Sequence, residues 1–335
     1  MQYRALNAVV IGGGYIGRMH ARMYAENPTA TLVGIVDVDE ETAETVANEF
    51  DANWWATDAQ TALDEYDVDV ASIATPEAYH RGPATTALDH DCTVLLEKPI
   101  AETVEDALAI GEAVEQSAGE LMIGYLLRFH PEYAALKNRI DEGDFGNVLS
   151  MHADRIRDRE MYARAARWTN TVYYLSVHDV DLMRWYTGSE VTEAYARGTQ
   201  PLEGYDTPAV VSASLEFDDG SVGTLESNWA RSPEHPAYRS DQFRITGTEG
   251  FGEKRERANV QVTTNDDFSY EQPVEIHGQA VGALRHQVDH VLQCARTGET
   301  PMVSWEDGLR SLAVGNALLK SLDADRPVSI DYPDL

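Results

Sequence analysis

Two side chains suited to moving a proton and to stabilising a negative charge stand at Lys98 and His178. An imidazole with an ordinary pKa of about 6.5 can take a hydroxyl proton at neutral pH and return it in the reverse direction. A lysine ammonium near a reacting oxygen favours the alkoxide that develops as hydride leaves carbon. These are the side-chain types that alcohol oxidation would use, and the alternatives are a solvated surface lysine and a histidine packed within a helix.

Asp181 lies one helical turn after His178 and could orient or charge-stabilise the imidazole. The His-x-x-Asp pair offers only two metal ligands, and the sequence shows no obvious third. We therefore predict no metal site.

The hydride acceptor for this chemistry is indicated by the first forty residues. An apolar run over 7–11 leads into Gly12-Gly-Gly14-Tyr15-Ile16-Gly17 and then a helical stretch. Gly12 allows a tight turn, Gly14 lets the backbone approach a pyrophosphate, and Gly17 lets the helix pack close to the sheet. The pattern predicts a dinucleotide-binding turn, and the alternative is a glycine-rich turn without a ligand.

Asp37 ends the second apolar run, at the distance from the glycine turn that such units have. Its carboxylate would accept hydrogen bonds from a ribose diol and repel a 2′-phosphate. We therefore expect NAD rather than NADP as the cofactor.

Strand-like and helix-like segments alternate through the first third of the chain, which predicts a parallel sheet. Strands are expected over 31–37, 68–74, 93–97 and 121–125, with a weak strand near Trp54. Helices are expected over 15–26, 40–50, 61–66, 80–89 and 104–117. Lys98 follows one of these strands, so its side chain should face the same crevice as the glycine turn.

The pattern changes beyond Arg128. Strands are expected over 148–156, 191–197, 209–217, 221–228, 241–246 and 260–264, and helices over 131–141, 173–186, 281–295 and 305–322. We predict an α/β fold with an NAD-binding Rossmann domain over 1–125 and a substrate-binding and oligomerisation α/β domain over 126–335. The second domain should carry a large open, mainly antiparallel sheet, and the last helices could pack back on the first domain.

The net charge of −31 is unusual for 335 residues, and only four of the 26 basic residues are lysines. Such an acidic, lysine-poor surface looks like that of a halophile protein, because concentrated salt screens self-repulsion. Nucleic acid is not an expected partner, since its phosphates would be repelled. No stretch approaches the roughly 20 apolar residues of a membrane span, so no membrane partner is expected.

The two cysteines, Cys92 and Cys294, are far apart and show no metal-ligand spacing. We interpret them as reduced thiols. The first residues show no basic region followed by an apolar signal segment, so a cytoplasmic location is expected.

Three further clusters stand in a fixed order after the glycine turn: Ala74-Thr-Pro-Glu-Ala-Tyr-His80, Glu97-Lys-Pro99 and His178-Asp-Val-Asp181. With that turn they resemble the Gfo/Idh/MocA oxidoreductase family, which includes glucose-fructose oxidoreductase and inositol dehydrogenase, over nearly the whole chain. The resemblance implies that Lys98 lies beside the nicotinamide and that His178 transfers the proton. It also implies nucleotide contacts from Ala74, Thr75, Pro76, His80 and Glu97.

The chain departs from the family pattern at two places. Many members carry an aspartate four residues before the histidine, where this chain has Tyr174. Tyr174 could bond to substrate, relay the proton or pack as an aromatic. Sugar and inositol dehydrogenases often have two adjacent basic residues where this chain has Leu127 and Arg128. Arg128 could contact the nicotinamide or substrate, or form a structural ion pair.

Weaker candidates for the substrate pocket are Asp154, Arg157, Trp168 and Tyr238. The aromatic planes of Trp168 and Tyr238 suit sugar faces, and the alternative is that they pack in a core or an interface. The resulting hypothesis is an NAD-dependent dehydrogenase acting on a secondary alcohol or hemiacetal carbon of a sugar, polyol or sugar derivative. Two alternatives are NAD use without net redox change and an inactive NAD-binding sensor or subunit. We expect a homodimer or homotetramer through the open sheet, whose exposed strands need covering.

Overall fold

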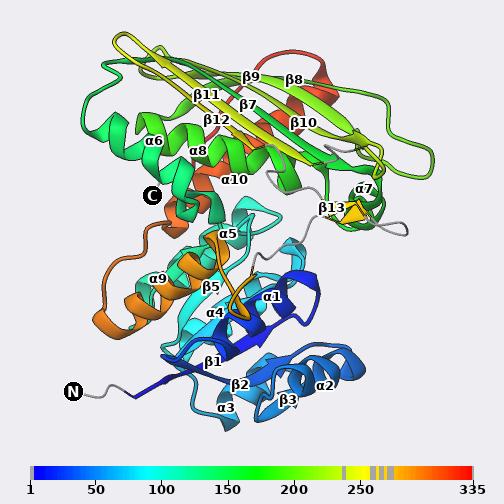
Figure 1. Cartoon of the computed structure of the whole chain (residues 1–335), viewed down its shortest axis with the longest axis vertical. Helices are drawn as coiled ribbons and strands as arrows, with labels where there is room; N and C mark the ends of the chain where they lie inside the picture. Colours follow the sequence, from blue (N-terminus) through cyan, green and yellow to red (C-terminus); the bar gives the residue numbers. More distant parts are fainter. Residues whose placement is uncertain (1–3, 236–238, 257–261, 264–267, 270–274, 334–335) are drawn as a thin grey trace. The chain divides into compact units, whose positions relative to one another are not determined.

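The computed structural model describes residues 4–235, 239–256, 262–263, 268–269 and 275–333. The chain forms two compact units (Figure 1). The first comprises Met1–Phe129 and Pro273–Leu309, and the second comprises His130–Gln272 and Arg310–Leu335.

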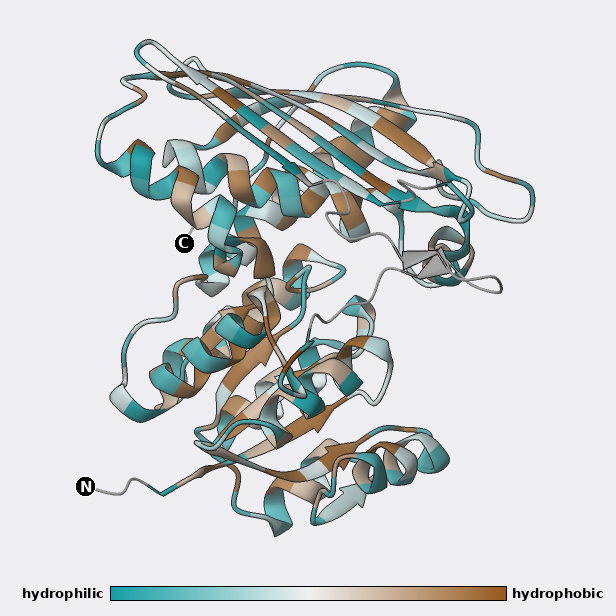
Figure 2. Ribbon diagram, in the orientation of Figure 1, coloured by the Kyte–Doolittle hydropathy of each residue, from teal (hydrophilic) through white to brown (hydrophobic). Residues whose placement is uncertain are grey.

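The first unit contains a six-stranded parallel sheet in the order β3-β2-β1-β4-β5-β6. Its strands are β1 (Leu6–Ile11), β2 (Ala30–Val36), β3 (Trp54–Ala56), β4 (Val70–Ile73), β5 (Thr93–Leu96) and β6 (Leu121–Ile123). The central strands are buried and almost wholly apolar, as expected of a parallel sheet covered on both faces (Figure 2). The strand order reverses between β1 and β4, which is where open α/β sheets bind ligands.

Short capping motifs fix the helices of this unit. Asp39, Asp58 and Thr103 each accept a hydrogen bond from a backbone N–H of the first turn that they precede. The helices are α1 (Tyr15–Ala25), α2 (Glu40–Glu49), α3 (Ala59–Glu65), α4 (Arg81–Asp89), α5 (Val104–Gln116) and α9 (Ala283–Thr297), with short 3₁₀ turns η1 (Glu77–Tyr79) and η2 (Leu126–Phe129). Although α9 comes late in the sequence, it packs against α1 and β5.

The second unit contains a seven-stranded sheet in the order β12-β11-β7-β10-β9-β8-β17. Its strands are β7 (Val148–Asp158), β8 (Val191–Gly198), β9 (Val210–Phe217), β10 (Val222–Arg231), β11 (Ser240–Gly247), β12 (Phe251–Glu256) and β17 (Val328–Ser329). The β7–β10 pair is parallel and the other pairs are antiparallel. The sheet is therefore mixed and mainly antiparallel.

The helices of this unit cover one face of the sheet (Figure 1). They are α6 (Pro131–Asp141), α7 (Arg159–Ala165), α8 (Val177–Thr187) and most of α10 (Trp305–Ala324). Along β7, Met151 and Ala153 on this face are buried, whereas His152 and Asp154 on the other face are only half-buried. No helix in the described part of the unit lies over that other face.

The predicted fold class is confirmed, and the differences are local. The helix expected over 173–186 begins instead with a π-helical turn, Val172–Ser176, which leads into α8. The strands expected over 68–74 and 121–125 are shorter, at Val70–Ile73 and Leu121–Ile123. Most of the strand expected over 260–264 lies outside the described residues, apart from β13 (Val262–Thr263), which pairs with β14 (Phe268–Ser269).

None of the helices in the described ranges combines the length and the apolar character that a transmembrane segment has.

Candidate active site

The glycine turn after β1 has the geometry that its sequence predicted. Gly12 has a φ of +101°, and a Cβ there would lie 2.7 Å from the Ala74 carbonyl carbon. A Cβ at Gly17 would lie 1.7 Å from the Gly12 oxygen. A Cβ at Gly14 would meet no atom within 4 Å. Gly12 and Gly17 are thus required by the fold, whereas Gly14 faces open space.

The start of α1 supplies donors to that space. Gly14 is the N-cap and makes no side-chain cap bond, and the first turn of α1 has no acidic residue. The first backbone N–H groups of α1 and its positive dipole end are therefore available to an anion. Tyr15 is exposed and Ile16 is half-buried. These features fit the pyrophosphate of a dinucleotide.

Asp37 is fixed at the end of β2 by the same turn. Its Oδ2 accepts a hydrogen bond from the Gly13 N–H at 2.7 Å, and its Oδ1 accepts one from the Asp39 N–H at 2.9 Å. Two carboxylate oxygens offer about four acceptor sites, so Asp37 keeps capacity for the hydroxyls of a ribose. The residues at this edge of the sheet therefore fit NAD.

The turn after β4 lies directly against the glycine turn. The Ala74 N–H donates to the Ile11 carbonyl at 2.8 Å, which joins this turn to the end of β1. Ala74 and Thr75 are half-buried and Pro76 is exposed, so all three can contact a ligand.

His80 does not line the surface of this edge as expected. Its side chain is 1% exposed. Its Nε2 lies 2.9 Å from the Thr75 carbonyl oxygen and its Nδ1 lies 3.2 Å from the Ile100 carbonyl oxygen. Burial lowers the pKa of the imidazole. Because backbone groups occupy both ring nitrogens, His80 lies beneath the ligand-facing turn, and its effect on a nucleotide would be indirect.

Glu97 and Lys98 follow β5. Glu97 is buried, and its Oε2 accepts a hydrogen bond from the Lys98 N–H at 3.3 Å. Its Oε1 lies 3.4 Å from Nε2 of His20, a fully buried residue of α1. Burial raises the pKa of the Glu97 carboxyl, but the His20 hydrogen bond and the charges of His20 and Lys98 outweigh burial and hold it below its usual range. The Lys98 side chain is half-buried.

His20 is a site residue that the sequence reasoning missed. It stands three residues after Gly17, so both lie on the face of α1 that packs against the sheet. The position of His20 three residues after Gly17, a glycine required for close packing, was the sequence feature that could have predicted its burial against the sheet.

Arg128, expected to contact nicotinamide or substrate, is 4% exposed. Its Nη1 donates to the Asp307 carboxylate at 3.0 Å and to the Met302 carbonyl at 3.2 Å. This geometry favours the structural ion pair over a ligand contact.

In the second unit, Tyr174 and His178 are half-buried, whereas all the other residues of 171–184 are buried. They lie four residues apart where the π-helical turn joins α8. Asp181, expected to orient His178, is fully buried. The carboxylate next to His178 in the sequence, Asp179, accepts two hydrogen bonds from Arg155 of β7, at 2.7 and 3.0 Å.

The Arg155–Asp179 pair belongs to a buried ionic network that anchors α8 to the sheet. Asp241 of β11 lies 3.2 Å from Arg155 and accepts hydrogen bonds from Arg157 at 2.6 and 3.1 Å. Burial raises the pKa of Asp241, but the two arginines outweigh burial and hold it well below its usual range. Arg157, considered as a substrate contact, is instead engaged in this network.

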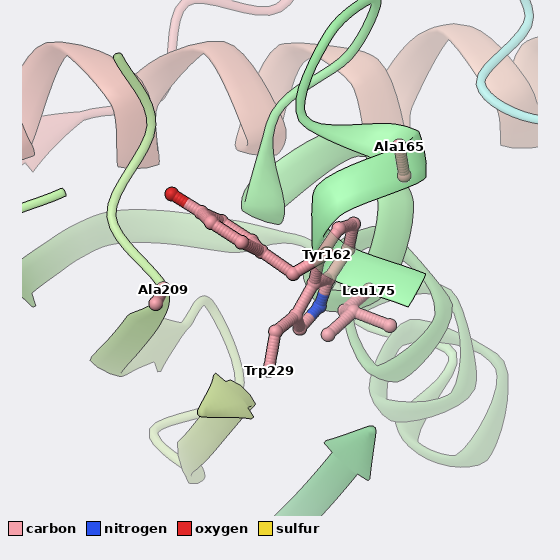
Figure 3. Packing of buried hydrophobic residues seen from close by; sticks show 5 residues of the cluster. All are labelled: Tyr162, Ala165, Leu175, Ala209 and Trp229. Carbon is pink, nitrogen blue, oxygen red and sulfur yellow. The ribbon is translucent and has the colours of Figure 1, made fainter. Parts of the chain in front are cut away.

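Tyr174 packs against a hydrophobic cluster. The buried part of this cluster comprises Tyr162, Ala165, Leu175, Ala209 and Trp229 (Figure 3). The Tyr174 ring makes edge contacts with the buried Trp229, at 4.9 Å between centroids, and with Trp168, at 6.0 Å. Trp168 is 51% exposed. Tyr174 therefore packs as an aromatic on one side while remaining half-exposed on the other.

Asp154 does not join this group. It precedes Arg155 on β7 and so points to the sheet face opposite α8, where it lies beside Glu226 of β10. Burial, followed by the charge of Glu226, raises the pKa of Asp154. The expected grouping of Asp154 with His178 is therefore wrong. Tyr238, also expected at the site, lies outside the described residues.

The parallel sheet, the glycine turn and Asp37 define the first unit as an NAD-binding Rossmann domain of an oxidoreductase. The model of the oxidoreductase family with an NAD-binding Rossmann fold matches residues 6–125, and that of the GFO/IDH/MocA C-terminal domain matches residues 133–252. The chain belongs to the Gfo/Idh/MocA family of oxidoreductases.

Relatives with assigned names include inositol dehydrogenases. The chain is 27% identical to the scyllo-inositol 2-dehydrogenase (NAD(+)) of Bacillus subtilis, over 97% of this chain and 96% of that one. It is 32% identical to inositol 2-dehydrogenase 4 of Saccharopolyspora erythraea over 68% of each chain. Its fold is similar to that of scyllo-inositol dehydrogenase from Lactobacillus casei with bound NAD(H) and scyllo-inositol, with a TM-score of 0.84, 19% identity and coverage of 97% and 99%.

Proposed function

We propose that the protein is an NAD-dependent dehydrogenase that oxidises a secondary alcohol of an inositol-like polyol or a sugar derivative. The position of Lys98 carries the proposal. It lies in the turn after β5, at the same sheet edge as the glycine turn after β1. The full-length similarity to an enzyme named for scyllo-inositol and NAD(+) supports a polyol as the substrate.

The proposed roles follow from the chemistry of the side chains. NAD⁺, when bound, supplies the hydride acceptor. The Lys98 ammonium would donate a hydrogen bond to the substrate hydroxyl oxygen and stabilise negative charge as it develops there. The His178 imidazole would take the hydroxyl proton. The Tyr174 hydroxyl and the exposed Trp168 ring would orient the substrate.

A substrate panel tests the proposal. Inositols, sugars and sugar acids are incubated with NAD⁺ or NADP⁺ in concentrated salt, and absorbance is followed at 340 nm. We expect turnover of at least one polyol with NAD⁺. Lys98→Met should bind NAD⁺ but lose activity, whereas Lys320→Met, at an exposed lysine of α10, should remain active. Unchanged turnover in Lys98→Met would exclude the assigned role.

The alternatives give different outcomes in the same assay. Substrate conversion without a change at 340 nm, with NAD that survives dialysis, would indicate chemistry without net redox change. NAD binding without conversion of any compound would indicate a sensor or an inactive subunit.

We also propose that the uncovered face of the second unit's sheet mediates a homodimer or homotetramer. Half-exposed polar residues such as His152, Asp154 and Glu226 line that face. Equilibrium sedimentation of the wild-type chain measures the assembly, and charge reversal at Glu226, as in Glu226→Lys, should weaken it.

The cellular setting that we propose is a salt-rich cytoplasm. The support is the net charge of −31 together with two free cysteines that lie buried within the fold.

A further inference from the structure

We propose that His80 is a positioning residue that couples the nucleotide-binding turn to the turn that carries Lys98. It bridges segments that are separate in sequence, because its two ring nitrogens face the carbonyl oxygens of Thr75 and Ile100 at 2.9 and 3.2 Å. The inference rests on the role proposed for Lys98.

The two bridged carbonyl groups belong to the two turns that would face the ligand. Thr75 belongs to the turn that packs against Gly12, where a Cβ would lie 2.9 Å from the Thr75 nitrogen. Ile100 stands two residues after Lys98, and its side chain is fully buried. A displacement of either carbonyl would therefore move a ligand-facing turn relative to the sheet.

The backbone holds His80 firmly enough to act as a bridge. His80 is the N-cap of α4, where its carbonyl accepts the Ala84 N–H at 3.0 Å. Its own N–H donates to the Glu77 carbonyl of η1 at 3.3 Å. The imidazole is thus a short, buried side chain on a fixed helix start, and it cannot reach a ligand itself.

The two contacts differ in strength. A neutral imidazole has one N–H donor, and both neighbours are acceptors, so only one full hydrogen bond forms at a time. The shorter distance favours the tautomer whose Nε2–H donates to the Thr75 carbonyl. In the other neutral tautomer Nδ1–H donates to the Ile100 carbonyl, so exchange between the two tautomers lets one imidazole hold both turns.

Two amide variants separate the contacts. In His80→Gln the amide nitrogen can occupy the position of Nε2 and bond to Thr75, whereas in His80→Asn it can occupy that of Nδ1 and bond to Ile100. We expect His80→Gln to bind NAD⁺ within about twofold of the wild type. His80→Asn should bind it about five- to tenfold more weakly, corresponding to the loss of one hydrogen bond. Isothermal titration calorimetry measures both values.

The accessibility of the Lys98 side chain is measured by acetylation with an N-hydroxysuccinimide ester. Mass spectrometry then gives the extent of acetylation of each of the four lysines in the chain. Saturating NAD⁺ should protect Lys98 in the wild type, and His80→Gln should lose at least half of that protection. Lys320 serves as the internal reference, since its labelling should not change.

Thermal unfolding of each variant provides the folding control. A purely structural role would lower the stability of both variants and leave NAD⁺ affinity and Lys98 protection the same in the two. That outcome, or wild-type values in both, would overturn the inference. Failure of the proposed function is distinguishable, because it appears as a wild-type protein that binds NAD⁺ but oxidises no compound of the panel.

Discussion

Two glycines of the same turn should respond in opposite ways to one added methyl group. In Gly12→Ala, the new Cβ would lie 2.7–2.9 Å from three backbone atoms of Ala74 and Thr75, at a φ of +101° that L residues rarely adopt. The conformational strain costs about 1–2 kcal/mol and the overlap about 1–3 kcal/mol. The first unit should therefore lose about 2–5 kcal/mol of its free energy of unfolding.

Gly14→Ala has the opposite expectation. The new Cβ would meet no protein atom within 4 Å, and the φ of −66° suits alanine. The stability should change by less than about 1 kcal/mol, the usual difference between glycine and alanine at an N-cap. The methyl group would occupy the space that we assign to the pyrophosphate, so NAD⁺ affinity should fall at least about tenfold, or about 1.4 kcal/mol.

Thermal unfolding in concentrated salt, with and without NAD⁺, measures the stability of both variants, and calorimetric titration measures affinity. Gly14→Ala should retain the wild-type midpoint without ligand and lose much of the increase that NAD⁺ gives. If Gly14→Ala binds NAD⁺ like the wild type, the pyrophosphate does not approach at Gly14. A Gly12→Ala protein as stable as the wild type would contradict the strain and overlap estimated at that position.

Three further predictions concern charge. Asp241→Asn removes the carboxylate between Arg155 and Arg157, and denaturant unfolding should show a loss of about 3–5 kcal/mol. Because the folded-state pKa of Asp241 is depressed, its stabilising contribution is present above the unfolded pKa of about 3.9 and is lost as pH falls below that value. The free energy of unfolding should therefore fall less steeply in acid in Asp241→Asn than in the wild type, and an unchanged pH dependence would contradict this. Asp37→Ser should lower NAD⁺ affinity and reduce the preference over NADP⁺, and an unchanged ratio of the two dissociation constants would refute the role of the carboxylate. The unfolding midpoint should rise between about 0.1 and 3 M KCl, because salt screens a net charge of −31, whereas a flat profile would remove the argument for adaptation to salt.

The cofactor turn could be predicted from the sequence because each of its positions answers a local requirement. Gly12 needs a positive φ, Gly17 needs close packing, and Asp37 ends a strand next to the turn. These requirements arise within one βαβ unit, so the spacing of the three residues along the sequence is enough to predict them. The parallel pairing of the first unit's sheet follows from the same units repeated.

The environments of Arg128 and His20 depend on contacts that spacing does not report. Arg128 pairs with Asp307, 179 residues further along the chain, and His20 of α1 meets Glu97 of the turn after β5. Asp154 is a different kind of error. Alternation along β7 was visible in the sequence, and counting from the apolar Met151 and Ala153 would have assigned Asp154 to the opposite face.

Tyr174, which stands in place of the family aspartate, bears on which of two residues, Tyr174 or His178, takes the substrate proton in the proposed mechanism. The stretch that carries Tyr174 and His178 is otherwise buried, yet both of these polar side chains remain half-exposed, which favours a ligand contact for the pair. A phenol with an ordinary pKa of about 10 can donate a hydrogen bond but cannot hold a substrate proton as a base at neutral pH. In the proposed mechanism the proton would then go to His178.

Tyr174→Phe should therefore lower kcat/KM by about tenfold, the effect of one hydrogen bond, while keeping the ring packed against Trp229. His178→Asn should lower it by about 10²–10⁴-fold and remove the acidic limb of the pH–rate profile, because no second base is available in this pair. Steady-state kinetics of the two variants across pH decide the matter. Equal losses, or an acidic limb that persists in His178→Asn and disappears in Tyr174→Phe, would mean that Tyr174 relays the proton and that replacement of the aspartate preserved the relay by other means.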